Sequence, residues 1–255
     1  MNAIKITVVF FILAVSFTAC DKNEPAETIT DIKPRPITET SSPYVSQVFE
    51  YAPAPGQFVN SSIGTSVAAQ SIIGKKGLVT LGGFGGYIVT GFDHSIMNTA
   101  DADFIVYGNA FNGSSEPGIV AVSVDSNQNG MPDDPWYELR GEDHNNPLTL
   151  PVYQISYQYA EAGQNVGWAD NQQKTGYVYA NTYHTQNYYP ESANKLPISR
   201  TGTRLPDNIT LVGTIYRGNS LGKGYADNYS AEYSTYQGNT FDISNAVDAQ
   251  GNSVT

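Results

Sequence analysis

From Tyr44 onward, short runs of apolar and β-branched residues alternate with clusters of Gly, Asn, Asp and Pro. This pattern is typical of β-strands joined by turns. No stretch of about 12 residues shows helical periodicity with caps. The expected strands are Gly77–Leu81, Tyr87–Phe92, Asp103–Tyr107, Ile119–Val124, Trp136–Arg140, Val152–Tyr159, Thr175–Ala180 and Ile209–Tyr216. The pattern therefore predicts an all-β protein.

Two of these runs indicate which strand faces are buried. In Val152–Tyr159 the odd positions from Tyr153 are aromatic or aliphatic, and the even positions between them are Gln and Ser. A period of two predicts a half-buried antiparallel strand. In Ile119–Val124 both faces are fairly apolar, which predicts a central strand. Eight or more such strands predict an antiparallel two-sheet β-sandwich of the jelly-roll type.

The glycine run Leu81–Gly86 resembles a phosphate-binding loop only superficially. It lacks the Gly-Lys-Ser/Thr ending, and the strand-like Tyr87–Thr90 follows it instead of a helix. A tight turn or bulge is the favoured interpretation.

The N-terminus has the pattern of a targeting segment. Lys5 precedes the apolar run Ile6–Phe17, which is too short to span a bilayer, and Ala19-Cys20 follows. A small residue before a Cys resembles a bacterial lipobox, which implies a signal peptide over 1–19 and a lipid on Cys20. The alternative is an ordinary signal peptide whose Cys is incidental.

The predicted location is the outer membrane, held by the lipid anchor, with the cell surface as the expected side. The Pro-rich stretch 20–43 is expected to be an extended tether. Residues 44–255 then form a single β-sandwich domain. The final Ser253–Thr255 resemble the start of a strand, so a C-terminal strand is either very short or missing.

The charge balance limits the classes of binding partner that the chain can have. The chain has 13 basic and 24 acidic residues and no basic cluster, which argues against a nucleic-acid partner. Cys20 is the only cysteine, so the mature domain has no disulfide although it is exported. Its stability must come from its core and from any bound metal.

The stretch Asp125–Asp134 has the spacing of a calcium loop. Oxygen-bearing side chains stand at loop positions one, three, five and nine, Gly130 stands at the turning position six, and the carbonyl of position seven completes the series. The expected ligands are Asp125, Asn127, Asn129, Met131 and Asp133. Calcium at the tip of a β-hairpin, in a structural role, is the favoured interpretation.

The calcium loop is incomplete at its twelfth position, where Trp136 replaces the bidentate Glu of the helical calcium motif. The missing ligand can come from Asp134 or Glu138. The alternative is a polar hairpin loop held together by Asn and Asp side chains that bond their own backbone.

Other candidate chemistry is weaker. His94, His144 and His184 lack metal-ligand spacing, and adjacent residues of a strand, such as Asp93 and His94, point to opposite faces. Carboxylates that could form a catalytic pair are Glu116, Glu138, Glu142 and Asp143. Nothing in the sequence pairs two of them across a cleft as in a glycosidase, so no enzyme is expected.

Aromatic residues in polar segments are the candidate ligand site. Stacking faces beside Asn and Asp suit a flat polar ligand such as a sugar, or a large ring system. The candidates are Trp168, Tyr183, His184, Tyr188 and Tyr189. The alternative is that these rings cap the edges of the sandwich.

Four blocks carry a family resemblance: Gly91–Ile96, Asp103–Phe111, Glu116–Val120 and Asp125–Leu139. They resemble a family of Bacteroidetes cell-surface lipoproteins, described as cell-surface or PKD-domain-containing proteins, over roughly residues 44–255. The resemblance implies a jelly-roll with a calcium loop, similar to carbohydrate-binding modules. Relatives are found beside TonB-dependent transporters, some linked to corrinoid capture. It assigns no ligand-contacting residue.

The favoured function is a lipid-anchored surface protein that captures a ligand, a glycan or a corrinoid, for an outer-membrane TonB-dependent importer. A structural or adhesion module that binds a protein partner is the alternative. A glycan-active hydrolase is a second alternative, which would require two carboxylates across a cleft.

Overall fold

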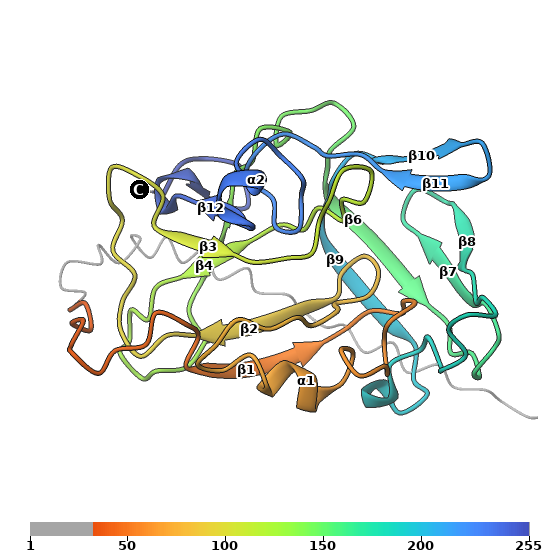
Figure 1. The fold of residues 1–255 in the computed structure, drawn as a ribbon, viewed down its shortest axis with the longest axis horizontal. Helices are drawn as coiled ribbons and strands as arrows, with labels where there is room; N and C mark the ends of the chain where they lie inside the picture. Colours follow the sequence, from red (N-terminus) through yellow and green to blue (C-terminus); the bar gives the residue numbers. More distant parts are fainter. Residues whose placement is uncertain (1–32, 255) are drawn as a thin grey trace, which may run out of the picture. The chain divides into compact units, whose positions relative to one another are not determined.

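The computed structural model describes residues 33–254, and in them almost all regular structure is antiparallel β (Figure 1). The thirteen strands of this part of the chain form five small sheets. Only short helical pieces interrupt them: α1 (Ser66–Gln70), α2 (Tyr233–Tyr236), and the 3-10 turns η1 (Glu191–Ala193) and η2 (Ile243–Asn245). The all-β prediction is confirmed. The jelly-roll connection of two sheets stays a prediction.

The largest sheet has four strands in the order β8-β7-β6-β9, all antiparallel to their neighbours. Its strands are β6 (Leu150–Tyr157), β7 (Val166–Asp170), β8 (Thr175–Val178) and β9 (Ile198–Arg204). Ser156 of β6 faces Ala169 on β7 and Ser199 on β9, and Ala169 in turn faces Thr175 on β8. The register therefore aligns one row of residues across all four strands.

The remaining sheets are smaller. A three-stranded sheet has the order β13-β5-β4, and three pairs of strands complete the set. The strands of the three-stranded sheet are β4 (Ala121–Ser123), β5 (Trp136–Leu139) and β13 (Ala246–Val247). The paired strands are β1 (Gln47–Ala52) with β2 (Tyr87–Gly91), β3 (Phe104–Val106) with β12 (Asn239–Phe241), and β10 (Ile209–Val212) with β11 (Ile215–Gly218).

Three strand predictions need correction. Gly77–Leu81 is irregular, because its carbonyl and amide groups bond loop segments instead of a neighbouring strand. Ile209–Tyr216 is not one strand: Gly213 takes a left-handed φ of +65° and folds the run into the β10–β11 hairpin. β4 lies at the edge of its sheet, because β5 occupies the centre.

The strands missed by the sequence pattern are β1, β7, β9, β12 and β13. Most of them are short or interrupted by polar residues, so their hydrophobic signal is weak. At the C-terminal side, Ser253 forms an isolated bridge to Val247 of β13.

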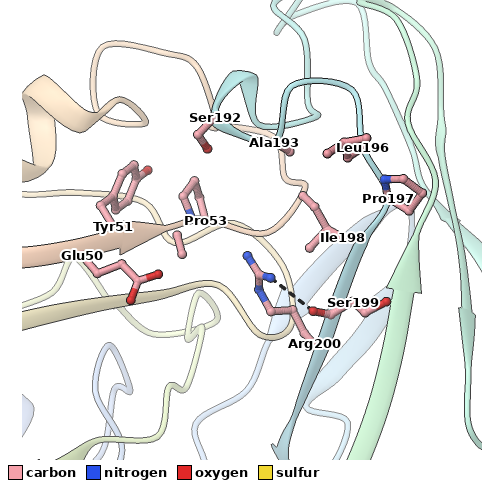
Figure 2. A pocket seen from close by; sticks show the side chains of 11 residues that line it. Glu50, Tyr51, Pro53, Ser192, Ala193, Leu196, Pro197, Ile198, Ser199 and Arg200 are labelled. Carbon is pink, nitrogen blue, oxygen red and sulfur yellow. Dashed lines mark hydrogen bonds between the residues drawn. The ribbon is translucent and has the colours of Figure 1, made fainter. Parts of the chain in front are cut away.

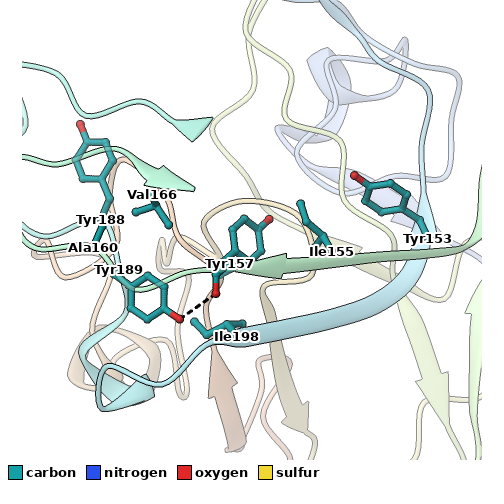
Figure 3. Close-up of a cluster of buried hydrophobic side chains, with 9 residues drawn as sticks. Tyr153, Ile155, Tyr157, Ala160, Val166, Tyr188, Tyr189 and Ile198 are labelled. Carbon is teal, nitrogen blue, oxygen red and sulfur yellow. Dashed lines mark hydrogen bonds between the residues drawn. The ribbon is translucent and has the colours of Figure 1, made fainter. Parts of the chain in front are cut away.

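The main core covers one face of the four-stranded sheet (Figure 3). Its buried members are Ala54, Tyr153, Ile155, Tyr157, Ala160, Val166, Tyr188, Tyr189 and Ile198. The alternation predicted for β6 is confirmed, since Tyr153, Ile155 and Tyr157 are each at most 6% exposed. Two of the buried tyrosines satisfy their hydroxyl groups: Tyr157 donates to the Phe84 carbonyl at 3.0 Å and Tyr189 to the Leu196 carbonyl at 2.5 Å, whereas the buried hydroxyl of Tyr188 has no hydrogen-bond partner.

The glycine run forms a turn against this core, as predicted. Arg200 of β9 donates from Nε to the Gly85 carbonyl at 2.9 Å. The Phe84 ring meets Tyr153 edge-to-face with centroids 4.8 Å apart. Gly82 has a φ of +75°, and a Cβ there would meet the Ala54 carbonyl oxygen at 1.9 Å. The close approach of two backbone segments therefore requires glycine.

The described end of the predicted tether is attached to the domain. The Arg35 amide donates to the Ser95 hydroxyl, and the Ser42 amide donates to Asp93 Oδ2, both at 2.9 Å. Asp93 Oδ1 also lies 2.7 Å from His94 Nδ1. The expectation that Asp93 and His94 diverge is wrong, because β2 ends at Gly91 and the two residues lie in a bend.

The targeting segment, with Cys20, lies outside the described residues. Within residues 33–254, no helix is long and apolar enough to cross a membrane.

We expect Gly82→Ala to lower the free energy of unfolding by at least about 3 kcal/mol, from the left-handed φ together with the clash against Ala54. Gly74→Ala is the matched control, because Gly74 has a φ of +73° but open space around its Cβ position. The control should cost about 1 kcal/mol. Urea denaturation measures both values. Equal losses would contradict the packing of the glycine turn.

Candidate functional site

The face of the four-stranded sheet opposite the core is exposed and built from small or uncharged polar residues. We call it the open face. Its members are Val152, Gln154, Ser156, Gly167, Ala169, Thr175, Tyr177, Ser199 and Thr201, with Tyr179 immediately after β8. None of them carries a charge, although the chain has a net charge of −11. The open face is therefore a neutral surface on an acidic protein.

The side chains at the centre of the open face are small, and several of them carry hydroxyl groups. Ser156 and Ser199 lie opposite each other on β6 and β9, with their hydroxyl oxygens 2.9 Å apart. Gly167 and Ala169 supply almost no side chain on β7. Four strands at about 4.8 Å spacing make the face about 14 Å wide from β8 to β9. The result is a shallow shelf that displays hydrogen-bonding groups.

Two tyrosines border the shelf on the β8 side. Tyr177 is 56% exposed and Tyr179 is 70% exposed, and their ring centroids are 5.9 Å apart. Tyr177 faces Gly167 across the ladder, and the Cβ position of that glycine lies 3.8 Å from the Tyr177 ring. The aromatic edge and the hydroxyl-bearing centre therefore belong to one continuous surface.

Sequence analysis did not single out Tyr177 and Tyr179, although it predicted their strand. The signal was present in the alternation of Thr175, Tyr177 and Tyr179 with Gly176 and Val178. Amino-acid composition alone does not reveal that Tyr177 and Tyr179 lie on the solvent-facing side of an edge strand.

Three of the five aromatic candidates lie on the core side. Tyr188 and Tyr189 are 2% and 1% exposed and belong to the core cluster. Trp168 is on the inner face of β7 and packs against Gly176, whose Cβ position is 2.4 Å from the indole ring. The expectation that Tyr188 and Tyr189 face solvent is wrong, because the polar residues around them form a turn while the rings point inward. Trp168 is partly buried.

The other two candidates remain nearer the surface. Tyr183 is 90% exposed, and its amide donates to Asn181 Oδ1 at 2.9 Å. His184 is half-buried and meets the Phe58 ring edge-to-face at 4.9 Å. The five candidates therefore do not share one exposed surface.

A pocket of about 520 Å³ adjoins the open face (Figure 2). Ser199 and Arg200 of β9 line one wall, and Glu50 and Tyr51 of β1 line another. Glu50 accepts a hydrogen bond of 2.6 Å from the Tyr87 hydroxyl. Ile198 and Arg200 also line the pocket, and they pair with the buried Tyr157 and Ile155. The pocket therefore lies along the edge of β9 on the core side of the sheet, and Ser199 separates it from the open face.

The predicted calcium loop connects β4 to β5, and the pairing of Ser123 with Trp136 places it at the tip of a hairpin. Gly130 has the expected left-handed φ of +74°. Its amide donates to Asp125 Oδ2 at 3.0 Å, and the Met131 amide donates to Asn129 Oδ1 at 2.7 Å. Asp125 and Asn129, which were predicted as cation ligands, thus also stabilise the conformation of the loop through hydrogen bonds to its backbone.

Two carboxylate oxygens in this loop lack a partner. Asp125 Oδ1 and Asp134 Oδ2 are buried atoms without a hydrogen bond. Ser126 donates to the other oxygen of Asp134. A buried anionic oxygen without a donor is unfavourable unless a cation neutralises it. This is the feature of the loop that fits a bound calcium ion.

Other features of the loop fit calcium less well. The amides of Asn129 and Asn127 donate to Asp133 and hold the pKa of that carboxyl below its usual range. Glu138 is directed away, since both of its oxygens accept from the Thr203 hydroxyl on β9 at 2.9 and 3.0 Å. Across residues 33–254, no three His, Cys, Asp or Glu side chains converge as a metal site. Of the two candidates for the missing ligand, only Asp134 lies within the loop.

The carboxylates considered for catalysis have structural partners. Glu142 accepts from the Lys223 amide at 3.0 Å, and Asp143 accepts from the Gly222 amide at 2.8 Å. Glu116 behaves differently: loss of solvent and the charge of Asp227 raise its pKa. Desolvation also raises the pKa of Asp227. Neither residue lines the pocket beside the open face.

Comparison of the chain with models of known protein families gives no match, and comparison with curated proteins gives none either.

Proposed function

We propose that this protein is a glycan-binding β-domain whose binding surface is the open face. The observation that supports the proposal is the combination, on one neutral sheet face, of exposed tyrosine rings with a shelf of Ser, Thr and Gln side chains. Sugar rings present apolar C–H faces and many hydroxyl groups. They therefore match aromatic stacking surfaces that are flanked by uncharged donors and acceptors.

The neutrality of the surface favours this ligand class over charged ones. An anionic ligand would be repelled by a chain of net charge −11, and the carboxylate that adjoins the open face, Glu138, is already bonded to the Thr203 hydroxyl at the end of β9. A corrinoid is the second ligand class, and it rests on the resemblance to surface lipoproteins found beside TonB-dependent transporters.

The same resemblance supports a cellular role. We propose that a lipid on Cys20 holds the protein at the outer membrane, where it captures its ligand for a TonB-dependent importer. The chain between Cys20 and Arg35, where attachment to the domain begins, spans up to about 45 Å at 3.1 Å per residue. A tether of this length allows the open face to meet ligand beyond the membrane surface.

A calcium ion in the β4–β5 loop has a structural role in this proposal. Asp125 and Asp134 would hold it through their unpartnered oxygens, with backbone carbonyls and water supplying the remaining ligands. Neutralising these carboxylates would secure the hairpin in a domain that has no disulfide.

The ligand proposal predicts the effect of removing the aromatic edge. Tyr177→Ala and Tyr179→Ala should each weaken glycan binding about tenfold or more, since truncating an aromatic anchor removes the stacking surface. Calorimetry of the mature chain carrying Cys20→Ser, titrated with neutral oligosaccharides and with cobalamin, measures the affinities.

Tyr236→Ala is the control for these variants, because Tyr236 is 51% exposed and lies outside the open face. It should bind like the unmodified chain. Binding of cobalamin without any oligosaccharide, or glycan binding that the two open-face variants leave unchanged, would contradict the proposal.

The calcium proposal predicts that chelation with EDTA lowers the melting temperature of the domain. Asp125→Ala should lower it as well and should remove the effect of EDTA, because the loop then lacks one of its two carboxylates with an unpartnered oxygen. Asp101→Ala, at an exposed aspartate outside the loop, should keep the response to EDTA. A melting curve of the unmodified chain that EDTA leaves unchanged would rule calcium out.

The anchor proposal predicts that Cys20→Ser releases the protein from carbonate-washed membranes into the soluble fraction, because the lipid attachment point is lost. Fractionation of cells that express the full chain, followed by immunoblotting, shows this directly. Retention of the variant in washed membranes at the level of the unmodified chain would contradict lipid anchoring.

A further inference from the structure

The β10–β11 hairpin exposes apolar side chains on both of its faces. Leu211 pairs with Tyr216 across the ladder, and Val212 pairs with Ile215. Because cross-strand partners share a face and successive residues alternate, the two pairs lie on opposite faces. These four side chains are between 52% and 73% exposed. The tip of the hairpin is therefore apolar all round.

The base of this hairpin is firmly held. Asn208 Nδ2 donates to the Asn219 carbonyl at 2.7 Å, and Asn219 Nδ2 donates to the Asn208 carbonyl at 3.0 Å. The Gly218 amide and carbonyl bond Gly113 and Ser115. A two-stranded hairpin is marginal in water on its own, and in Figure 1 this pair shares no sheet with the other strands. The fold thus stabilises the base of the hairpin and leaves the apolar tip in water.

The charge around the hairpin argues against a second copy of the chain as its partner. The chain as a whole has a net charge of −11, whereas residues 208–219 carry only the positive charge of Arg217. The net negative charges of two copies would repel each other. The presence of apolar side chains on both faces of the hairpin also distinguishes between a protein groove and a lipid bilayer as the partner. A protein groove covers one face of a hairpin and leaves the other in water, whereas hydrocarbon surrounds both.

We propose that the tip of this hairpin, residues 211–216, inserts shallowly into a lipid bilayer. Tyr216 would place its ring at the interface, where amphipathic aromatic side chains are favoured. Arg217 lies one residue below and pairs with Thr210, at the level where its long side chain can meet headgroup phosphates. Insertion is shallow because the open strand edges must keep their contact with water.

This interaction goes beyond the proposed function and does not require the lipid on Cys20. Insertion of the hairpin would fix the orientation of the domain on the membrane. A lipid on a tether would only hold the domain close to the membrane.

The test uses the mature chain carrying Cys20→Ser and phosphatidylcholine vesicles in a sedimentation assay. The chain should bind the vesicles, and adding Leu211→Ser with Ile215→Ser should lower the partition coefficient at least about tenfold, because two large apolar side chains no longer leave water. Adding Val67→Ser with Leu148→Ser is the control, since these residues are 79% and 69% exposed elsewhere. The control should bind like the parent.

A fluorescence measurement identifies the inserted residue. With Tyr216→Trp, the emission of the new indole should shift to the blue when vesicles are added, whereas Tyr236→Trp should show no added shift. Absence of vesicle binding by the parent chain, or equal binding after Leu211→Ser with Ile215→Ser, would overturn the proposal. Concentration-dependent dimerisation that the same double variant abolishes would also overturn it, and would identify a second copy as the partner.

Discussion

The two-sided character of strand β6 is the constraint on which the rest of the structure depends. Successive side chains of a strand point to opposite faces, so burying Tyr153, Ile155 and Tyr157 obliges Gln154 and Ser156 to face water. The register of β7, β8 and β9 then extends both faces across the sheet. The core and the proposed glycan surface are therefore two sides of one sheet, and a shift of one residue in β6 would exchange them.

The alternation along β6 allowed this constraint to be predicted from the sequence, because a period of two over eight residues is a strong signal. The glycine turn and the β4–β5 hairpin loop were predictable for a different reason: Gly82 and Gly130 take a left-handed φ, which glycine adopts without a steric penalty. Strand partners were not predictable, since they depend on contacts between distant segments. The position of β4 at a sheet edge is an example. The hairpin in 209–216 is instead a local pairing, and its sequence signal, Gly213 in the turn, was missed.

The candidate site was only partly predictable. Polar neighbours suggested that Tyr188 and Tyr189 face solvent, yet their hydroxyl groups lie in the interior and the rings fill the core. For Tyr189 a single hydrogen bond, to the Leu196 carbonyl, satisfies the buried hydroxyl, so a polar sequence neighbourhood did not reveal the burial of its ring. Tyr177 and Tyr179 are exposed for the opposite reason: β8 is an edge strand, and its outer face has no layer above it.

The central claim is that the open face binds the ligand, and a crystal structure of the domain in complex with a bound oligosaccharide tests it most directly. The account predicts sugar rings stacked on Tyr177 and Tyr179, with hydroxyl groups bonded to Ser156 or Ser199. A ligand bound elsewhere, with the open face still solvated, would contradict the account.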